Sequence, residues 1–255
     1  MHILVTNDDG VAAAGLLTLA QELLKTHQVT ILAPDRNWSA SGHVKTMHRP
    51  LRVNEILLDG GMHALTTDGA PSDCVALAML GLIEEKIDIV VSGINPNANI
   101  GHDVTYSGTV TAAMEAAIWG IPGIAVSLDS PEHHSGELNY GPAARIANQV
   151  VEMVINRHLE SKTILNVNVP YGDDESIKGF QITRQGLRVY HDRLDRRVDP
   201  RGREYYWIGG DLPTGVAEEG TDYGSLSKGY VSITPLQLDL TATKMLETLR
   251  DWEWS

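Results

Sequence analysis

Short apolar runs alternate with longer amphipathic stretches over about the first 170 residues of this chain. The runs are rich in Val, Ile and Leu and have the length of strands, whereas the stretches repeat apolar residues at helical spacing. This pattern predicts strands at residues 2–7, 29–33, 51–57, 87–92, 121–127 and 163–169. It predicts helices at residues 13–25, 71–82, 109–119 and 141–159. Alternating strands and helices require right-handed crossovers and a largely parallel sheet covered on both faces. We therefore expect an α/β fold, a three-layer α/β/α sandwich of the doubly wound, Rossmann-like kind.

A different pattern begins after Pro170. Residues 171–225 are rich in Gly, Arg and Asp and contain short aromatic strand candidates at 179–184 and 204–208. Such a segment favours a projecting hairpin over another strand, helix, strand unit. Protruding elements often serve oligomerisation, so we expect this extension to lie at a subunit interface.

The last part of the chain returns to regular patterns. Residues 230–234 predict a further strand, and residues 240–252 predict a closing helix with Thr241 as its N-cap. A chain of 255 residues is often one α/β domain with one core. We therefore expect a single domain whose core covers about residues 1–170 and whose extension covers about residues 171–255.

The charge balance narrows the choice of partners. A formal net charge of -13 disfavours binding to a long nucleic acid. The single cysteine, Cys74, excludes an internal disulfide, and no apolar run reaches the roughly 18 residues that span a bilayer. The first residues show a strand pattern without a basic segment or a cleavage site. We expect a cytoplasmic protein with no membrane partner.

Two adjacent aspartates, Asp8 and Asp9, directly follow the first apolar run and precede Gly10. A strand that ends in this way brings carboxylates to the carboxyl edge of the sheet, where open α/β folds bind their ligands. Neighbouring carboxylates repel, and a hard divalent cation with oxygen ligands relieves that repulsion. An ordinary turn is the alternative, because Asn-Asp-Asp-Gly is also good turn sequence.

Two polar loops are expected at the same edge, because parallel strands all point the same way. One follows the strand at 29–33 and contains Ser39; the other follows the strand at 87–92 and contains Asn95. A hydroxyl and an amide carbonyl are neutral oxygen ligands that complete the shell of Mg²⁺ or Mn²⁺ without adding charge. The alternatives are a loop hydroxyl for Ser39 and an Asx turn for Asn95.

The segment Ser107-Gly108-Thr109 opens the helix predicted from residue 109. Unpaired backbone amides at a helix start, with nearby hydroxyls and a glycine that permits close approach, form a site for phosphate. The alternative is an ordinary Ser107 N-cap. On the phosphate interpretation, a bulky side chain at Gly108 would obstruct the phosphate but leave the cation site intact.

Seven short motifs, spread in order over nearly the whole chain, resemble those of a known family, the stationary-phase survival proteins (SurE). Members of that family are metal-dependent nucleoside monophosphate phosphatases. The matching segments are TNDDG at 6–10, APDR with SASG within 33–42, TDGAPSDCV at 67–75, SGIN at 92–95, YSGTV at 106–110, GIP at 120–122 and GYVSITPL at 229–236. Their number and order make the resemblance specific.

The resemblance implies a 5′-nucleotidase, with nucleoside 3′-monophosphates as further candidate substrates. It assigns one divalent cation per subunit, Mg²⁺ or Mn²⁺, to Asp8, Asp9, Ser39 and Asn95, and makes the two aspartates catalytic. It places the phosphate near Asn95 and the segment Ser107, Gly108 and Thr109. It also implies a homodimer or a homotetramer in which the extensions exchange between subunits.

Some positions depart from the usual family pattern. Ala70 stands where a threonine is usual, and Val44 with Lys45 replaces a Ser-Ile pair. Asn97 replaces a glycine, and asparagine tolerates the left-handed backbone conformation better than other non-glycine residues. All these positions lie outside the four expected cation ligands, so they bear on substrate preference more than on activity.

The chemistry expected from these residues is hydrolysis of a phosphate monoester, with the nucleophile either water or one of the aspartates. Asp103, His43 and His48 are further acid or base candidates, although exposed loop residues of these types commonly have no such role. Two alternatives remain open at this stage. One is a phosphatase that prefers short polyphosphate or sugar phosphates, and the other is a non-catalytic nucleotide sensor, since a fold alone does not determine function.

Overall fold

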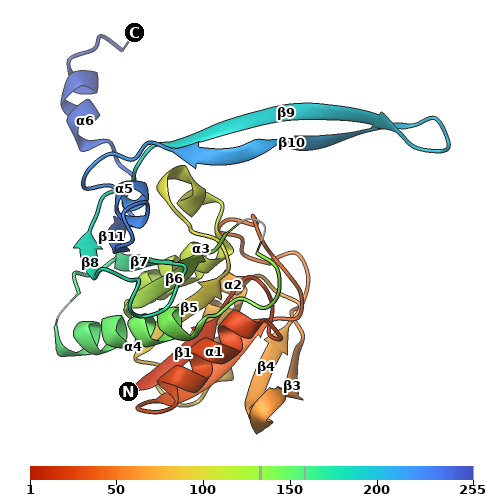
Figure 1. Ribbon diagram of the computed structural model, residues 1–255, viewed down its shortest axis with the longest axis vertical. Helices are drawn as coiled ribbons and strands as arrows, with labels where there is room; N and C mark the ends of the chain where they lie inside the picture. The colour runs from red at the N-terminus through yellow and green to blue at the C-terminus, as the bar shows by residue number, and fades with distance from the viewer. Residues whose placement is uncertain (132–133, 158, 255) are drawn as a thin grey trace.

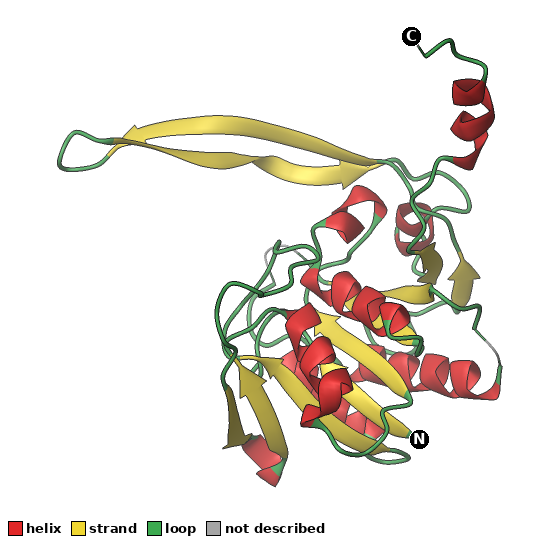
Figure 2. Cartoon of the chain, turned by 180° about the vertical axis from the view of Figure 1, so that it is seen from behind, coloured by secondary structure: helices red, strands yellow, loops and turns green. Residues whose placement is uncertain are grey.

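The computed structural model describes residues 1–131, 134–157 and 159–254, and its body is a sheet with helices on both faces (Figures 1 and 2). The strands are β1 (His2–Thr6), β2 (Gln28–Pro34), β3 (Val53–Leu57), β4 (His63–Thr67), β5 (Ile89–Asn95), β6 (Gly123–Asp129), β7 (Thr163–Pro170), β8 (Phe180–Ile182), β9 (Arg188–Val198), β10 (Glu204–Gly215) and β11 (Val231–Gln237). The α-helices are α1 (Ala14–Leu23), α2 (Pro71–Leu77), α3 (Gly108–Ile118), α4 (Gly141–Asn156), α5 (Asp222–Leu226) and α6 (Thr243–Arg250). The predicted three-layer α/β fold is confirmed.

Nine strands form the main sheet in the order β3-β4-β2-β1-β5-β6-β7-β11-β8. The strands from β4 to β7 in this order run parallel to one another, as the crossovers predicted. Alternate side chains of β1 face opposite layers: Ile3 and Val5 belong to the core under α1 and α4, and Leu4 belongs to the core under α2 and α3. A strand buried on both faces explains why the first apolar run is uninterrupted.

One strand of the sheet was missed by the prediction. The predicted strand 51–57 begins at Val53 and pairs antiparallel with β4, for which no strand was predicted. A short 3₁₀ turn, Asp59–Gly61, connects the two, with positive φ at Gly60 and Gly61. The Asp-Gly-Gly sequence was the available hairpin signal, but β4 is too short to stand out by periodicity.

The helix ends also differ from the prediction. The helix predicted at 71–82 is α only to Leu77 and continues as a π-helical turn that includes Gly81 at positive φ. The predicted helix 141–159 ends at Asn156 in the structure, and residue 158 lies outside the described residues. None of the helices in the described part of the chain combines the length and the apolar character that crossing a bilayer requires.

The region after Pro170 contributes both to the sheet and to a projection. Strand β11 pairs antiparallel with β7, and β8 pairs parallel with β11, so part of the predicted extension belongs to the body. Strands β9 and β10 form a long antiparallel hairpin that projects from the body, as Figure 1 shows. The projecting hairpin was predicted, but β9 was not, because its sequence is dominated by charged residues.

The C-terminal helix α6 lies apart from the sheet and has no buried residue (Figure 2). Its N-cap is Ala242, so the predicted cap at Thr241 is wrong. The backbone N–H of Thr241 donates instead to Asp239 Oδ1 at 2.9 Å, which places Thr241 in the turn before the helix.

Candidate functional site

The carboxyl edge of the sheet brings the two aspartates beside the polar loops. Strand β1 pairs with β5 so that Thr6 lies opposite Ser92, and the chain therefore leaves β1 next to the end of β5 that carries Asn95. The loop after β2 meets the same turn, because the backbone N–H of Trp38 donates to Asp8 O at 2.7 Å. Ser39 is the next residue of that loop. The predicted convergence of the two loops on the aspartates therefore occurs.

The side chain of Asn7 stabilises the turn between residues 7 and 10, a role that was the alternative interpretation of the two aspartates. Its side-chain Nδ2 donates to Gly10 O at 3.0 Å, and the backbone N–H of Gly10 donates to Asn7 Oδ1 at 3.2 Å. Gly10 adopts φ 104°, where a side chain would be strained and would press on the backbone of Arg36. Because Asn7 closes the turn, the carboxylates of Asp8 and Asp9 are not needed for it.

Asp8 is held against the start of α3. Its side chain is only 3% exposed, and its Oδ1 accepts a hydrogen bond from Thr109 Oγ1 at 2.6 Å. Burial raises the pKa of Asp8, and the Thr109 hydroxyl and the backbone amides of Thr109 and Gly108 act in the opposite direction. The helix start therefore orients Asp8 and partly stabilises its ionised form.

Asp9 is half-buried beside Asp8. Burial, with the negative charge of Asp8, raises the pKa of Asp9 to about 7. No ion pair links Asp8 or Asp9 to a basic side chain among the residues that the structure describes. Two close carboxylates without a protein cation are the donor set that a hard divalent cation fits.

The neutral oxygen donors suit the same cation. In the described ranges, no group of three or more His, Cys, Asp or Glu side chains is arranged to hold a metal. Ser39 is exposed, and Asn95 is half-buried and donates its Nδ2 to Asn97 O at 2.5 Å. That contact uses the amide nitrogen of Asn95 and leaves its carbonyl oxygen as the possible ligand atom.

Without metal, the protein should lose stability as the pH rises through the Asp9 pKa. The folded-state pKa of about 7 lies above the ordinary value of 3.8, so Asp9 binds its proton more tightly in the folded protein. The contribution of Asp9 to the free energy of unfolding should therefore be fully present below the ordinary value and be lost as the pH rises through about 7. Urea unfolding in EDTA measures this slope. Asp9→Asn should flatten it, and an unchanged slope in that variant would contradict the assignment.

The start of α3 serves Asp8 directly. Ser107 is the N-cap of α3 and accepts a hydrogen bond from the Val110 N–H at 3.1 Å, which confirms the N-cap interpretation. The Thr109 hydroxyl, expected near the phosphate, is engaged by Asp8 instead. A Cβ added at Gly108 would lie 2.7 Å from Asp8 Cβ and 3.1 Å from Pro71 Cγ. The expectation that a bulky residue at Gly108 spares the cation site is therefore wrong.

Gly108→Ala should weaken Mn²⁺ binding and hydrolysis together. The added methyl group would displace Asp8, since the alternative is a clash with a buried carboxylate. We expect a loss of at least about 10-fold in Mn²⁺ affinity, measured by calorimetry, because misplaced supporting groups cost this much at metal sites. Leu57→Ala is the control, because Leu57 is 66% exposed on β3, away from the start of α3. Unchanged Mn²⁺ affinity in Gly108→Ala would show that Asp8 is not a ligand.

The acid or base candidates have other partners. Asp103 accepts from the Tyr190 hydroxyl at 2.5 Å and forms an ion pair with Arg188 Nε at 2.9 Å, so β9 engages its carboxylate. His43 Nε2 lies 2.9 Å from Glu115 Oε2 on α3. His48 is exposed. These contacts make Asp103 and His43 structural links between loops and the body.

One residue near the site was not predicted. Tyr140, at the start of α4, lies close to Gly15, whose added Cβ would be 3.1 Å from the Tyr140 ring. Burial and the charge of Asp9 raise the pKa of Tyr140 to about 12, so its hydroxyl stays protonated beside that carboxylate. No local pattern in the sequence marks this tyrosine, because only the fold brings it to the site.

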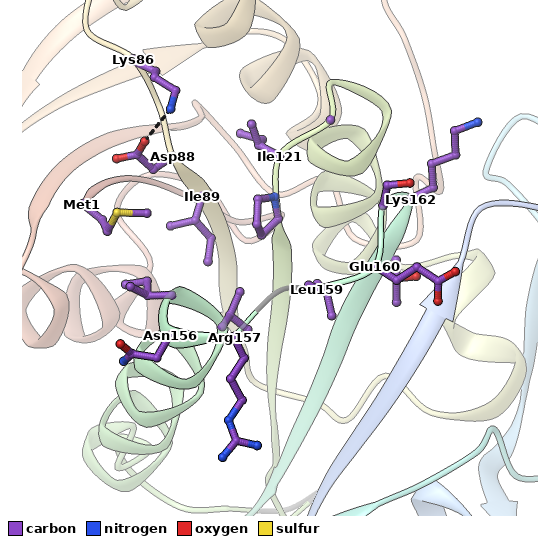
Figure 3. Close-up of a pocket in the computed structure, with 16 residues that line it drawn as sticks. Met1, Lys86, Asp88, Ile89, Ile121, Asn156, Arg157, Leu159, Glu160 and Lys162 are labelled. Carbon is purple, nitrogen blue, oxygen red and sulfur yellow. Dashed lines mark ion pairs between the residues drawn. The ribbon is translucent and has the colours of Figure 1, made fainter.

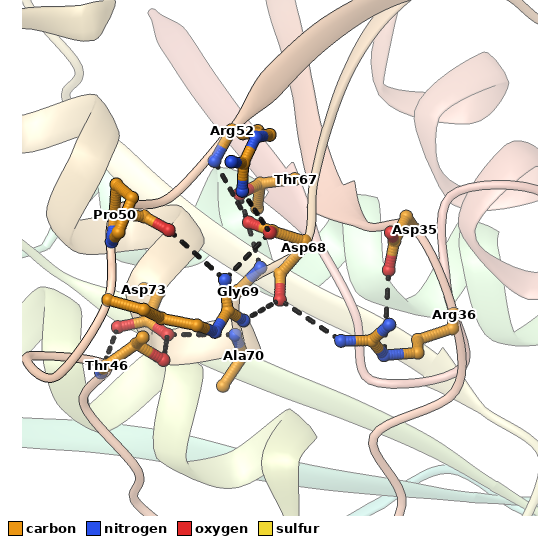
Figure 4. Close-up of polar contacts among 11 residues, drawn as sticks. Asp35, Arg36, Thr46, Pro50, Arg52, Thr67, Asp68, Gly69, Ala70 and Asp73 are labelled. Atoms are coloured by element: carbon orange, nitrogen blue, oxygen red, sulfur yellow. Dashed lines mark hydrogen bonds and ion pairs between the residues drawn. The ribbon is translucent and has the colours of Figure 1, made fainter.

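The motif at 67–75 forms a polar network beside the site (Figure 4). Arg49 Nη1 donates to Asp68 Oδ2 at 2.7 Å, and Arg52 lies 3.8 Å from the same oxygen. Asp73 accepts from the Ala70 N–H at 2.9 Å and caps α2, so the helix start does not depend on a threonine at position 70. Pro71 of this segment packs toward Gly108, which links the network to the wall of the site.

A second departure from the family pattern is Asn97, which replaces a glycine. Asn97 does not adopt a positive φ: within the described residues, Ala40 and Lys162 are the non-glycine residues that do. The expected left-handed conformation at position 97 is therefore wrong. The turn accepts asparagine because an ordinary backbone conformation suffices there.

A cavity of about 560 Å³ lies at the opposite, amino edge of the sheet (Figure 3). It is lined by the start of the chain, the residues before β5 and β6 and the end of α4, with Lys86 and Asp88 paired at 3.2 Å on its wall. None of the predicted site residues lines it. The cavity is therefore separate from the site at the carboxyl edge.

Comparisons with known proteins find several that are similar to this chain. The family model described as "Survival protein SurE" matches residues 3–192. The "5'-nucleotidase SurE" of Chloroflexus aggregans is 49% identical over 254 residues, covering 100% of each chain, and that of Geobacter sulfurreducens is 50% identical, covering 100% of this chain and 95% of the relative. A crystal structure of the SurE protein from Aquifex aeolicus is similar with a TM-score of 0.82 and 40% identity, covering 98% of each chain.

Proposed function

We propose that this chain, which belongs to the SurE family, hydrolyses nucleoside 5′-monophosphates to nucleoside and phosphate with the help of one divalent cation. Membership of the family follows from the match over residues 3–192 and from relatives about half identical over the full length. Those relatives are named 5′-nucleotidases, and this supports the substrate class. The observation that carries the chemistry is the adjacent pair of buried Asp8 and half-buried Asp9 at the carboxyl edge of the sheet.

We assign the cation, Mg²⁺ or Mn²⁺, to Asp8, Asp9, Ser39 and Asn95. Asp8 is pre-oriented by the Thr109 hydroxyl, and Ser39 follows the residue whose backbone contacts Asp8. When bound, a divalent cation supplies Lewis acidity toward a phosphoryl oxygen and lowers the pKa of water. The other two proposed ligands, Ser39 and Asn95, are neutral, so the shell adds no negative charge beyond that of the two carboxylates.

We place the phosphate between Asn95 and the start of α3. The Ser107 oxygen accepts from Val110 N, so its own hydroxyl proton remains available to a phosphoryl oxygen. The positive end of the α3 dipole lies at the same place and favours an anion. Thr109 acts there through Asp8, because its hydroxyl is already donated to that carboxylate. Positioning and charge neutralisation of this kind are the main contributions of a protein to phosphoryl transfer.

A substrate panel tests this function. Purified protein should hydrolyse nucleoside 5′-monophosphates in Mn²⁺ or Mg²⁺ and lose that activity in EDTA, measured as phosphate release. The same panel, extended to 3′-monophosphates, sugar phosphates and short polyphosphate, identifies the preferred substrate. A better rate on sugar phosphates or polyphosphate would replace the proposed substrate. Binding of nucleotide without hydrolysis in any metal would indicate a sensor.

We also propose that the protein is a homodimer or homotetramer assembled through the region after Pro170. An isolated two-stranded hairpin is marginally stable in water, yet β9 and β10 form a long one that projects from the body. Large apolar side chains on it are strongly exposed, among them Ile208 at 84% and Leu194 at 68%. A second copy that covers these side chains supplies the missing contacts.

A further inference from the structure

A buried carboxylate on α3 lies outside the proposed cation and phosphate contacts. Glu115 is 3% exposed, and its oxygens have three hydrogen-bond partners. Oε2 lies 2.9 Å from His43 Nε2, and Oε1 accepts from Trp119 Nε1 at 3.0 Å and from Lys45 Nζ at 3.3 Å. A buried charge persists only when it is paired and hydrogen-bonded, and His43 with Lys45 provides that pairing from one loop.

The same loop carries Ser39. Residues 38–46 contain no helix or strand, and Ala40 among them adopts φ 57°. The backbone N–H of Trp38 at the start of the loop donates to Asp8 O, and the Thr46 side chain at its end donates to Asp73 Oδ2 at 2.7 Å. Between these ends, the loop depends on contacts with the body to keep a single conformation.

The middle of the loop is attached to α3 and to the segment before it. Gly42 N–H donates to Tyr106 O at 2.8 Å, and the Thr111 hydroxyl donates to Gly42 O at 3.1 Å. In the same stretch, His43 and Lys45 contact the buried Glu115 of α3. The Ser72 hydroxyl of α2 donates to Val44 O at 2.5 Å. The contacts of Gly42, His43 and Lys45 come from the helix whose start orients Asp8, or from Tyr106, two residues before that helix begins.

We propose that Glu115 is a positioning residue that, through His43, fixes the loop carrying Ser39 and so keeps this oxygen in place as a ligand of the proposed cation. This assignment rests on the proposed function. Outer-shell contacts that touch a metal ligand are commonly worth 10–100-fold in metal affinity or activity, and a contact that acts through the loop should lie at the lower end of this range. Burial acts to raise the pKa of Glu115, but the hydrogen bonds from His43 and Trp119 and the charge of Lys45 hold it below its ordinary value. Glu115 is therefore ionised at neutral pH and available to pair with His43.

The position of Glu115 argues against a direct role for His43 at the phosphate. Glu115 is seven residues after Gly108 on a continuous helix, which places it about 10 Å along the axis at 1.5 Å per residue. The Nε2 atom of His43 is within hydrogen-bond distance of this carboxylate. Its action on the reaction is therefore through the loop.

The test breaks the contact from its exposed side, where the fold is at little risk. His43→Ala removes the partner of Glu115, and His43→Gln restores a donor, because the glutamine amide can reach the same oxygen. Glu152→Ala is the matched control. Glu152 lies on α4, away from the site, and pairs with His27 at 3.1 Å. Three measurements apply to each variant: Mn²⁺ affinity by calorimetry, amide hydrogen exchange of residues 38–46 in the metal-free protein, and hydrolysis of AMP and p-nitrophenyl phosphate.

His43→Ala should raise the Mn²⁺ dissociation constant about 10-fold, speed exchange of residues 38–46 and lower kcat/KM equally on both substrates. His43→Gln should recover each property to within a few-fold, and Glu152→Ala should match the wild type. Wild-type affinity and exchange in His43→Ala overturn the assignment. So does a loss confined to AMP that His43→Gln cannot restore, because that result makes His43 a general acid for a poor leaving group. A wild-type protein that binds no Mn²⁺ and hydrolyses neither substrate overturns the proposed function itself.

Discussion

Asp8→Asn and Asp9→Asn should each reduce Mn²⁺ affinity and nucleotide hydrolysis by about 100-fold or more, which corresponds to roughly 2.8 kcal/mol at 1.4 kcal/mol per factor of ten. These carboxylates are the two charged ligands in the proposed shell, and a neutral amide oxygen attracts a divalent cation far less. The fold should survive, because asparagine has nearly the same shape as aspartate, and the amide oxygen that replaces the Asp8 carboxylate can still accept the hydrogen bond from Thr109.

Calorimetry with Mn²⁺ and phosphate release from AMP measure the two losses separately. The exposed Asp59, in the turn between β3 and β4, provides a control that has the same charge change away from the site. Metal-free Asp9→Asn should also unfold at a higher urea concentration than the metal-free wild type at pH 8, since it removes a carboxylate that resists ionisation. Full activity of the wild type in EDTA, or wild-type Mn²⁺ affinity in both variants, would show that the cation is not held here.

The wild-type protein should have two or four times the subunit mass of 27.8 kDa in light scattering at micromolar concentration. Replacing Trp207 and Ile208 together by serine should convert it largely to monomer. These side chains are 60% and 84% exposed on β10, and apolar groups of this size left in water are costly unless a partner covers them. We expect the subunit dissociation constant to rise by about 100-fold, because two large side chains of this type dominate typical interfaces.

The control for this change is Leu57→Ser, which removes a side chain that is 66% exposed on β3, at the other end of the sheet. Its mass should remain that of the wild type. A cut after Val169 is a poor test of assembly, because it would remove β11, whose Val231 is fully buried in the main core. A wild-type chain that is monomeric at micromolar concentration would contradict the proposed assembly.

The layered architecture and the family were determined by the sequence itself. Uninterrupted apolar runs such as Ile3-Leu4-Val5 have both faces buried, and this pattern is a local property that can be read along the chain. The polar loops after parallel strands necessarily meet at one edge, so the sequence alone places Asp8, Asp9, Ser39 and Asn95 in one group. The motifs that mark the family are short, ordered and local. Six of the seven lie within the match over residues 3–192, and the motif at 229–236 lies within the range covered by the full-length relatives.

The partner of each side chain was decided only by the tertiary structure. Thr109 lies 101 residues from Asp8, and Glu115 lies 72 residues from His43, so no local pattern specifies that these groups meet. The sequence also does not show that a side chain at position 108 would clash with Asp8. Nor does it show that β11 pairs with β7, from which three strands separate it in the chain. Local sequence determines which element forms and which face is apolar, whereas the packing of distant elements determines which polar atoms lie within hydrogen-bond distance. The chemistry of this site depends on the packing of distant elements.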